Sequence, residues 1–579
     1  MKTNCPLDFD FLRTQIVGAD AAVKTPFGER LMVYADYTAS GRCLSMIEKY
    51  IQNLQRIYAN THTEDDISGR SMTRLLEDAE HAIKQSVNAG PDGRIICIGT
   101  GATGAIDKLQ QIIGVALPPA TRQNLARMME DALGVEAHTA FSEYLQNRQP
   151  VVFVGPYEHH SNEISWRENL ATVVEVRLDA SGSVDLDHLE SLLQEPAYLG
   201  RMRIGSFSAA SNVTGMLTPV HEIAALLHRF DAIACFDYAA SAPYVEINMN
   251  PAEGKYPGDA SLDAVFISPH KFLGGPGASG VLVFNKRIYH AELPPSVSAG
   301  GTVDYVGPTS QDFIVDIEER EKAGTPGVLQ ILKAGLAFQI KDRVGVAAIE
   351  KRECELLQRT FERWQGNPNI EILGNPDADR RISIVSFNLK DPAGKYLHPK
   401  FVTSLLNDLF GIQSRAGCSC AGPYGHRLLD IDFEKSEQYR KWIKKGFCGI
   451  KPGWCRISLH YTMDDIEADF ILDAIEFVAE QGHHFLSLYD FDMQTGAWLH
   501  KSDCGCMEGF SLDAALDCTG YQSRTLSAAE RAMLYSAFLD EAKGQAQNLA
   551  AQQPPRQHLA DAELEGLKFF SVPELSVTR

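Results

Sequence analysis

Short apolar runs, each closed by a polar or turn-forming segment, recur through the first half of the chain. Apolar runs of this length that end at Gly, Pro, Ser or Asp are typical of buried strands. They lie at residues 95–98, 151–154, 203–207, 232–237, 264–267 and 281–284. The pattern therefore predicts a series of buried strands between residues 95 and 284.

Helical patterns alternate with these runs. Residues 73–89 place Leu76, Ala79 and Ile83 on one face, and residues 219–230 show the same spacing. Strands that alternate with helices predict an α/β structure with a mostly parallel sheet. Ligands of such sheets bind at the carboxyl ends of the strands, so the residues that follow each strand are the candidate site.

A second pattern follows residue 320. Residues 328–344 predict a strongly amphipathic helix that leads into a smaller α/β domain. The expected elements of that domain are strands at 382–387 and 456–460 and helices at 401–410 and 464–480. The expected domains are a lead-in (1–30), a large α/β domain (31–320), a smaller α/β domain (321–484) and a C-terminal extension (485–579).

Two further segments predict helices outside this plan. Residues 118–149 predict one or two additional surface helices. In the extension, Ser527 and Glu530 have the spacing of a capping box, which predicts a helix that starts there and ends near residue 551.

The chain has 579 residues, a net charge of −21 and a sequence pI near 5.3. This length exceeds one ordinary domain, and the acidic balance argues against nucleic acid or anionic membranes as partners. No apolar run approaches the about 18 residues of a membrane span, and the N-terminus lacks the apolar core of a signal peptide. The 12 scattered cysteines indicate reduced thiols rather than a disulfide framework. We therefore expect a cytoplasmic protein.

Two strand ends carry a chemically informative pair. Asp237 ends the run at 232–237, and Lys271 follows the run at 264–267. A glycine- and proline-rich stretch, 274–280, fixes the backbone after Lys271. A pyridoxal phosphate (PLP) site requires a lysine that bonds to the cofactor aldehyde and an aspartate that keeps the pyridine nitrogen protonated.

The segments FDYAASAP (236–243) and SPHKFLGGPG (268–277) resemble the class V aminotransferase superfamily of PLP enzymes. Within it they are most similar to the cysteine desulfurase and selenocysteine lyase branch. The resemblance covers residues 31–480. It implies PLP as the cofactor and fold type I, with a seven-stranded, mostly parallel sheet in the large domain.

A glycine-rich turn, GTGATGAI (99–106), follows the run at 95–98 and opens a helix. Such a turn presents backbone N–H groups and the positive end of a helix dipole, which together bind anions. In the resembled family this segment binds the cofactor phosphate, with Ala102 and Thr103 as donors. Ser268 and His270 match further phosphate-binding positions.

Other matches surround the cofactor ring. In the motif EHHSN, His159 matches the histidine that stacks on the pyridine ring and moves a proton. A metal site on His159 and His160 is the weaker interpretation, because no Cys or carboxylate lies at ligand spacing. Asn212 matches an asparagine near the ring oxygen. Ala240 departs from the family, whose desulfurases place a polar side chain on that oxygen. Either Ser241 or a water would replace that side chain, or the internal aldimine is tuned differently.

The smaller domain carries the motif SRAGCSCAG (414–422). Cys420 lies between two glycines and is expected to be mobile and accessible, and Arg415 nearby would favour its thiolate. The group II desulfurases have the pattern R-x-G-x-x-C-A, whose nucleophilic cysteine corresponds to Cys420. Two interpretations of Cys418 stay open: it resolves a persulfide, or it packs.

Substrate contacts are expected from both domains. Arg456 matches the arginine that binds the substrate α-carboxylate as a bidentate pair. Arg415 lies near the same site. Thr38 and Ala39 match a segment at the mouth of the family's active site, although a strand followed by a polar turn explains them equally well.

Two loops imply assembly. Residues 298–303 and 321–327 match loops that cross a dimer interface in the family, where Thr325 would contact the cofactor phosphate of the partner subunit. A homodimer is therefore expected from the resemblance.

The extension has its own cysteines, Cys504, Cys506 and Cys518. They offer ligands for zinc or acceptors for sulfur, but a fourth ligand at the usual spacing is missing, so we predict no metal.

The sequence thus predicts a PLP-dependent, cysteine desulfurase-like enzyme with Lys271, His159 and Cys420 as catalytic residues. It would remove sulfur or selenium from an amino acid, giving alanine and an enzyme persulfide, with a protein as a possible sulfur acceptor. The alternatives are a C–S β-lyase, an aminotransferase or an epimerase of the same superfamily, or a non-catalytic sulfur-transfer partner that kept the fold.

Overall fold

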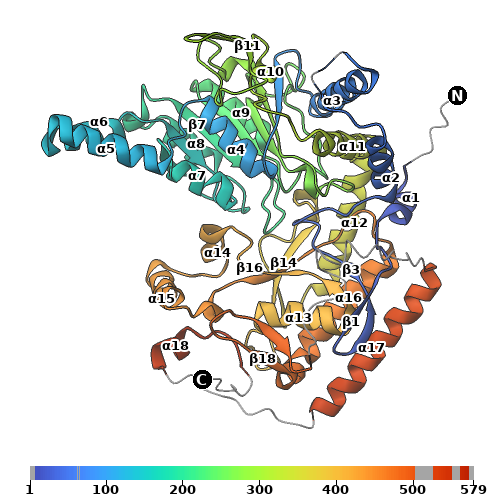
Figure 1. Cartoon of the computed structure of the whole chain (residues 1–579). Helices are drawn as coiled ribbons and strands as arrows, with labels where there is room; N and C mark the ends of the chain where they lie inside the picture. The colour runs from blue at the N-terminus through green and yellow to red at the C-terminus, as the bar shows by residue number, and fades with distance from the viewer. Residues whose placement is uncertain (1–6, 62, 64, 503–525, 551–560, 573–579) are drawn as a thin grey trace. The chain divides into compact units, whose positions relative to one another are not determined.

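The structure is a computed structural model that describes residues 7–61, 63, 65–502, 526–550 and 561–572. The chain divides into two compact units (Figure 1). The first spans Ala39–Glu350, and the second joins Asp8–Thr38 to Lys351–Arg579.

A seven-stranded sheet forms the core of the first unit (Figure 1), in the order β4-β10-β9-β8-β7-β5-β6. Strand β10 is antiparallel to both neighbours, and the other neighbouring pairs are parallel. The mostly parallel sheet predicted from the sequence is therefore confirmed; only the edge strand β6 has no predicted counterpart. The bounds are β4 (Gly93–Cys97), β5 (Val151–Val154), β6 (Thr172–Glu175), β7 (Arg203–Ser208), β8 (Ile233–Asp237), β9 (Ala264–Ile267) and β10 (Val281–Asn285).

Helices cover this sheet because its central strands are apolar on both faces. Ile106 and Leu109 of helix α4 pack in one cluster with Ile96 and Phe266 of the sheet. The helices and remaining strands of this unit are α2 (Ser45–Gln55), α3 (Ile67–Ser86), α4 (Gly101–Ile112), α7 (Ile164–Arg167), α8 (Leu186–Leu193), α9 (Val220–Arg229), β11 (Val303–Val306), β12 (Gln311–Phe313) and α10 (Ile317–Arg320).

Helix α11 (Val328–Val344) forms where predicted but is not amphipathic. Residues around most of its circumference are buried. Gly335 packs closely on Ala79 of α3, and the Phe338 ring lies 4.6 Å from the Phe272 ring. Neighbouring elements therefore cover this helix on more than one side, where the sequence predicts a solvent-exposed polar face.

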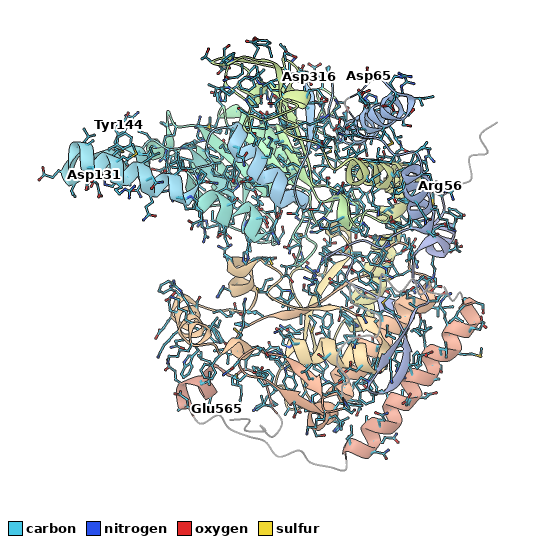
Figure 2. All side chains as sticks on the ribbon, viewed as in Figure 1. Arg56, Asp65, Asp131, Tyr144, Asp316 and Glu565 are labelled. Carbon is cyan, nitrogen blue, oxygen red and sulfur yellow. The ribbon has the colours of Figure 1, made fainter. Side chains whose placement is uncertain are left out.

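Helices α5 (Pro119–Leu133) and α6 (Val135–Gln146) are the predicted additional surface helices. They lie side by side and project from the first unit (Figure 1), and Figure 2 labels Asp131 and Tyr144 on them. No residue of either helix is buried. The pair therefore adds surface without adding to the core.

An antiparallel sheet, ordered β13-β14-β17-β16, is the centre of the second unit. The strands and helices predicted between residues 382 and 480 are found within two residues of their predicted bounds. The bounds are α12 (Val346–Trp364), β13 (Ile370–Ile372), β14 (Ile384–Leu389), α13 (Pro399–Phe410), β16 (Arg415–Gly417), α14 (Gly422–Leu428), α15 (Phe433–Lys444), β17 (Trp454–Ser458) and α16 (Asp465–Gln481).

The N-terminal segment belongs to this second unit. Strand β3 (Val33–Tyr34) pairs in parallel with β15 (Ile412–Gln413). Helix α1 (Phe9–Gln15) and the hairpin of β1 (Ala22–Thr25) and β2 (Gly28–Leu31) precede it.

The C-terminal extension packs on the same unit through α17 (Ala528–Ala550). Its predicted capping box is confirmed: the Ser527 N–H donates to the Glu530 carboxylate at 2.8 Å, and the Glu530 N–H donates to Ser527 Oγ at 3.3 Å. Tyr535 stacks on Phe470 with ring centroids 4.0 Å apart. The other elements are β18 (Tyr489–Phe491), β19 (Trp498–His500) and α18 (Ala562–Leu567). Among the described residues, no helix combines the length and apolar character needed to cross a membrane.

Candidate active site

One cavity in the first unit lies at the carboxyl ends of β5, β7, β8 and β9 and at the start of α4. Its volume is about 170 Å³. Eight of the nine predicted cofactor-binding residues line it, namely Ala102, Thr103, His159, Asn212, Asp237, Ser268, His270 and Lys271. The structure thus brings together residues that the sequence distributes over five separate segments.

The start of α4 forms an open cradle on one side of this cavity. Gly99 and Gly101 have φ angles of +58° and +60°, a conformation that favours glycine. The Ala102 N–H donates to Ser268 Oγ at 2.9 Å. A Cβ atom at Gly101 would lie 2.7 Å from Ser268 Oγ and 2.8 Å from His270 Cε1, so only glycine keeps the cradle open. The N–H groups of the first helical turn and these hydroxyl donors suit a phosphate.

Asp237 ends β8 with its carboxylate buried at the cavity wall. Only 4% of the residue is exposed, and its Oδ1 accepts the Ala239 N–H at 2.8 Å. Burial raises the pKa of Asp237, while the Ala239 N–H and the charge of Lys271 lower it. A protonated ring nitrogen would be a favourable neighbour for this carboxylate, because it would compensate the buried negative charge.

Close backbone packing holds Lys271 in place. It ends the short 3₁₀ helix that begins at Pro269, and the Gly41 N–H donates to the carbonyl before it, that of His270, at 2.9 Å. Gly275 packs against the Pro269 carbonyl so closely that no side chain fits. Burial, together with the charge of Lys271, lowers the pKa of His270 to about 4. His270 is therefore neutral near pH 7.

His159 follows β5 and is oriented by its own loop. The Ser161 N–H donates to His159 Nδ1 at 3.1 Å, so the neutral ring carries its proton on Nε2. The Ser161 hydroxyl lies 2.7 Å from Thr103 Oγ1. The histidine and the cradle therefore share a hydrogen-bond network.

Glu158 is a residue that the sequence analysis did not single out. Its carboxylate is buried and accepts four hydrogen bonds: from the Gly155 N–H at 3.1 Å, the Ser208 N–H at 2.8 Å, the Ser208 hydroxyl at 2.7 Å and the Asn162 amide at 2.7 Å. Burial raises the pKa of Glu158 to about 7, against the effect of these donors. The carboxylate ties the loop after β5 to the end of β7 and so fixes two walls of the cavity.

Ala240 lines the cavity with a methyl group. The expectation that Ser241 replaces the missing polar contact is not met, because Ser241 is fully buried and is not among the lining residues. Two alternatives remain, namely a water or a cofactor linkage that is tuned differently.

The donor set of the cavity fits PLP. The cradle offers N–H and hydroxyl donors to a phosphate, Asp237 offers a buried carboxylate to a pyridine nitrogen, and Lys271 offers a primary amine to an aldehyde.

A second cluster of predicted residues lies in the second unit. The Asp36 carboxylate accepts Arg456 Nη2 at 3.1 Å and Arg415 Nε at 2.9 Å. Arg456 is 4% exposed, and burial lowers its pKa while Asp36 raises it. Thr38 is buried, and its hydroxyl lies 2.6 Å from Ser458 Oγ. Asp36 is the member of this cluster that sequence reasoning missed.

Cys420 lies in the tight turn between β16 and α14. It is exposed, and Cys418 is half-buried. The Arg415 guanidinium is also paired with Asp36, and the effect of Arg415 on the Cys420 thiolate stays a prediction. The charge of Cys420 contributes to the pKa of Arg456. The exposed thiol and the buried guanidinium are therefore within electrostatic range of each other.

The remaining predicted residues do not line the cavity or lie outside the described residues. Ala39 is half-buried in the first unit. Thr325 is exposed on a loop that the Gly324 N–H joins to the Gly300 carbonyl at 2.8 Å. Cys504, Cys506 and Cys518 lie outside the described residues.

Comparison with known proteins agrees with this geometry. The sequence model of the family described as aminotransferase class-V matches residues 132–470. The chain belongs to the class V aminotransferase family. It is thus a PLP-dependent enzyme of fold type I.

Two proteins of similar sequence carry the name cysteine desulfurase. A protein of Halalkalibacterium halodurans named "probable cysteine desulfurase" is 28% identical over 405 residues, which cover 69% of this chain and 86% of the relative. A protein of the same name from Streptomyces coelicolor is 24% identical over 453 residues, covering 77% of this chain and 92% of the relative.

Solved structures share the fold. A cysteine desulfurase from Thermococcus onnurineus has a TM-score of 0.61 at 20% identity, covering 81% of this chain and 97% of that chain. The cysteine desulfurase CsdA from Escherichia coli has a TM-score of 0.58 at 20% identity, covering 81% and 98%. The match thus includes nearly the whole length of both solved chains.

Proposed function

We propose that this enzyme removes sulfur from cysteine, or selenium from selenocysteine, and releases alanine while Cys420 takes the chalcogen. The observation that carries the proposal is the exposed Cys420 thiol in a tight turn, within electrostatic range of the buried Arg456. A PLP enzyme that transfers only amino groups has no use for such a thiol. The similarity to proteins named as cysteine desulfurases supports the same conclusion.

The cavity residues would hold and activate the cofactor. Bound PLP withdraws electrons from the α-carbon of the amino acid. Lys271 would bind the cofactor aldehyde, Asp237 would keep the ring nitrogen protonated, and the cradle with Ala102, Thr103 and Ser268 would bind the phosphate. The Lys271 amine would also move the α-proton of the substrate. Because His270 is neutral, it adds no second positive charge beside the Lys271 amine.

The second cluster would bind and cleave the substrate. Arg456, paired with Asp36, would bind the α-carboxylate of the substrate. The Cys420 thiolate attacks the substrate sulfur, the C–S bond breaks, and its electron pair returns to the substrate carbon, which is protonated to give alanine. The sulfur remains on Cys420 as a persulfide, ready for a thiol of an acceptor protein.

We also propose a homodimer. The loops around Gly300 and Gly324 are hydrogen-bonded to each other, and Thr325 is exposed on them. A loop of this kind can present its hydroxyl to a second copy. Sedimentation of the PLP-loaded protein tests this, since a monomer at micromolar concentration contradicts it.

The test of the proposed function compares three proteins, all loaded with PLP: the wild type, Cys420→Ser, and the control Cys448→Ser, whose thiol is also exposed in the second unit. Alanine is measured after addition of L-cysteine and a dithiol reductant. We expect equal rates for the wild type and Cys448→Ser and a loss of about 100-fold or more for Cys420→Ser, with cofactor absorbance unchanged. Equal alanine formation by Cys420→Ser would refute Cys420 as the nucleophile.

A further inference from the structure

Two thiols share the turn between β16 and α14. The Ala421 N–H donates to the Cys418 carbonyl at 3.0 Å, which closes a four-residue turn from Cys418 to Ala421. Ser419 and Cys420 have φ angles of +50° and +55°, so this is a type I′ turn with cysteines at its first and third positions. A turn of this type holds the Cα atoms of its first and third residues roughly 5–6 Å apart, within the range of Cα separations that a disulfide spans.

The backbone of this turn is unusual for its residues. Type I′ turns favour Asn and Gly at the two central positions, because L-residues with side chains adopt positive φ at a cost in free energy. Among the described residues, Ser419 and Cys420 are the one adjacent pair of non-glycine residues with positive φ. Gly417, with φ +128°, and the closely packed Gly453 hold the turn at its base. The surrounding fold therefore imposes the arrangement of the two thiols.

The two thiols differ in access. Cys420 is exposed, and Cys418 is half-buried. A substrate or an acceptor therefore reaches Cys420 more readily, and sulfur carried by Cys418 is better shielded from solvent. The proposed function uses only the Cys420 thiol.

We propose that Cys418 is a second sulfur-carrying thiol, an inference that rests on the proposed function because Cys420 must take the sulfur first. The Cys418 thiolate attacks the outer sulfur of the Cys420 persulfide. The S–S bond to Cys420 breaks as the bond to Cys418 forms, and Cys420 leaves as a thiolate that takes up the proton given by Cys418. One S–S bond replaces another, so no oxidant or reductant is needed. Cys420 is then free for a second substrate while the first sulfur is still bound.

The experiment measures how many alanines form before any sulfur leaves the protein. PLP-loaded wild type, Cys418→Ser, Cys418→Ala and Cys420→Ser are mixed with L-cysteine in a rapid-quench instrument without reductant or acceptor. We expect a burst of about two alanines per site for the wild type and half that for both Cys418 variants. The alanine variant checks that a hydroxyl does not replace the thiol.

Mass spectrometry locates the sulfur. Cleavage after Arg415 and Arg427 gives the peptide 416–427, which contains both thiols and no other cysteine. We expect fragment ions that place sulfur on Cys418 and Cys420 in the wild type, on Cys420 alone in the Cys418 variants, and on neither in Cys420→Ser. Sulfur on Cys420 alone in the wild type, or on Cys418 in Cys420→Ser, overturns this proposal while alanine formation by the wild type leaves the desulfurase function intact. A wild type that forms no alanine overturns both.

Discussion

Asp36 and Arg456 form a buried ion pair in the second unit, with Oδ1 3.1 Å from Nη2. The second carboxylate oxygen of Asp36 accepts Arg415 Nε at 2.9 Å. Burial lowers the pKa of Arg456, and Asp36 opposes this effect. Asp36 therefore offsets the cost of burying the guanidinium charge and orients the Arg456 side chain before any substrate binds.

This pair gives the first prediction. Asp36→Ala leaves the Arg456 charge buried without its carboxylate, so we expect the KM for cysteine to rise about tenfold or more and the free energy of unfolding to fall by about 3 kcal/mol. Asp36→Asn keeps a hydrogen-bond acceptor, so its KM and its free energy of unfolding should lie between those of the wild type and Asp36→Ala. Steady-state kinetics and denaturant unfolding measure these quantities. An Asp36→Ala enzyme with the wild-type KM would show that Asp36 does not position Arg456.

The cradle at α4 gives a prediction with a matched control. Gly101→Ala puts a Cβ within 2.8 Å of Ser268 and His270 at φ +60°, whereas Gly114→Ala, just after the end of the same helix at φ +76°, meets nothing within 4 Å. Both substitutions carry a similar backbone penalty of about 1 kcal/mol. We expect only Gly101→Ala to lose PLP on dialysis, with its Kd raised about tenfold or more. Equal retention by both variants argues against a phosphate at this cradle.

Asp237 tests the electronic role of the cavity. Asparagine has the same shape but no charge, so it would not hold the ring nitrogen protonated. For Asp237→Asn we expect kcat to fall by about 100-fold or more, with PLP still bound and the fold intact. The measurement is kcat at saturating cofactor, with the absorbance spectrum as the control for occupancy. A kcat within about threefold of the wild type would be incompatible with this role.

His398 is expected to make the second unit less stable in acid. Burial lowers its pKa from 6.5 to about 4 in the folded protein. Between these values the unfolded chain binds a proton that the folded protein does not, so stability falls as pH falls from 6.5 to 4 and is unaffected above 6.5. The change from this one group is about 3 kcal/mol.

His398→Gln removes the titrating ring and checks this account. The variant should be less stable near pH 7, since His398 Nε2 lies 3.1 Å from the Gly449 carbonyl. It should lose less of its remaining stability than the wild type between pH 7 and pH 4.5, as measured by Tm. Parallel loss of Tm in both proteins would mean that His398 titrates normally.

The projecting helices α5 and α6 predict a tolerated deletion. No residue of either helix is buried, so a short Gly-Ser linker in place of residues 119–146 should leave Tm within a few degrees of the wild type. Cofactor binding should also persist. A large fall in Tm would contradict this prediction, because it would show that the two helices stabilise the core.

Much of the fold and most of the cofactor site can be read from the sequence, because their signals are local. Asp237 ends one apolar run and Lys271 follows another. The order of strand and turn alone therefore places both residues at the carboxyl ends of neighbouring parallel strands. The phosphate cradle is likewise a single segment. Ala102 and Thr103 need no distant partner to be recognised.

The errors concern properties that depend on distant partners. Glu158 escaped notice because two of the four hydrogen bonds to its carboxylate come from Ser208, 50 positions later. Asp36 escaped notice for the same reason, since its partner Arg456 is 420 positions away. Ser241 failed as a polar contact because sequence spacing does not tell whether a turn residue is exposed to the cavity or buried behind it. Neighbouring elements cover helix α11 on the side where a polar face was expected, and the pattern of the helix alone does not reveal these neighbours.

In the proposed reaction, attack on sulfur breaks the C–S bond of cysteine and leaves alanine. The most direct measurement is the product of L-cysteine with the PLP-loaded wild-type protein under a dithiol reductant, with alanine, pyruvate and sulfide measured together. We expect alanine and sulfide in equal amounts with no pyruvate. Pyruvate and sulfide in equal amounts, without alanine, would contradict it and identify an elimination lyase.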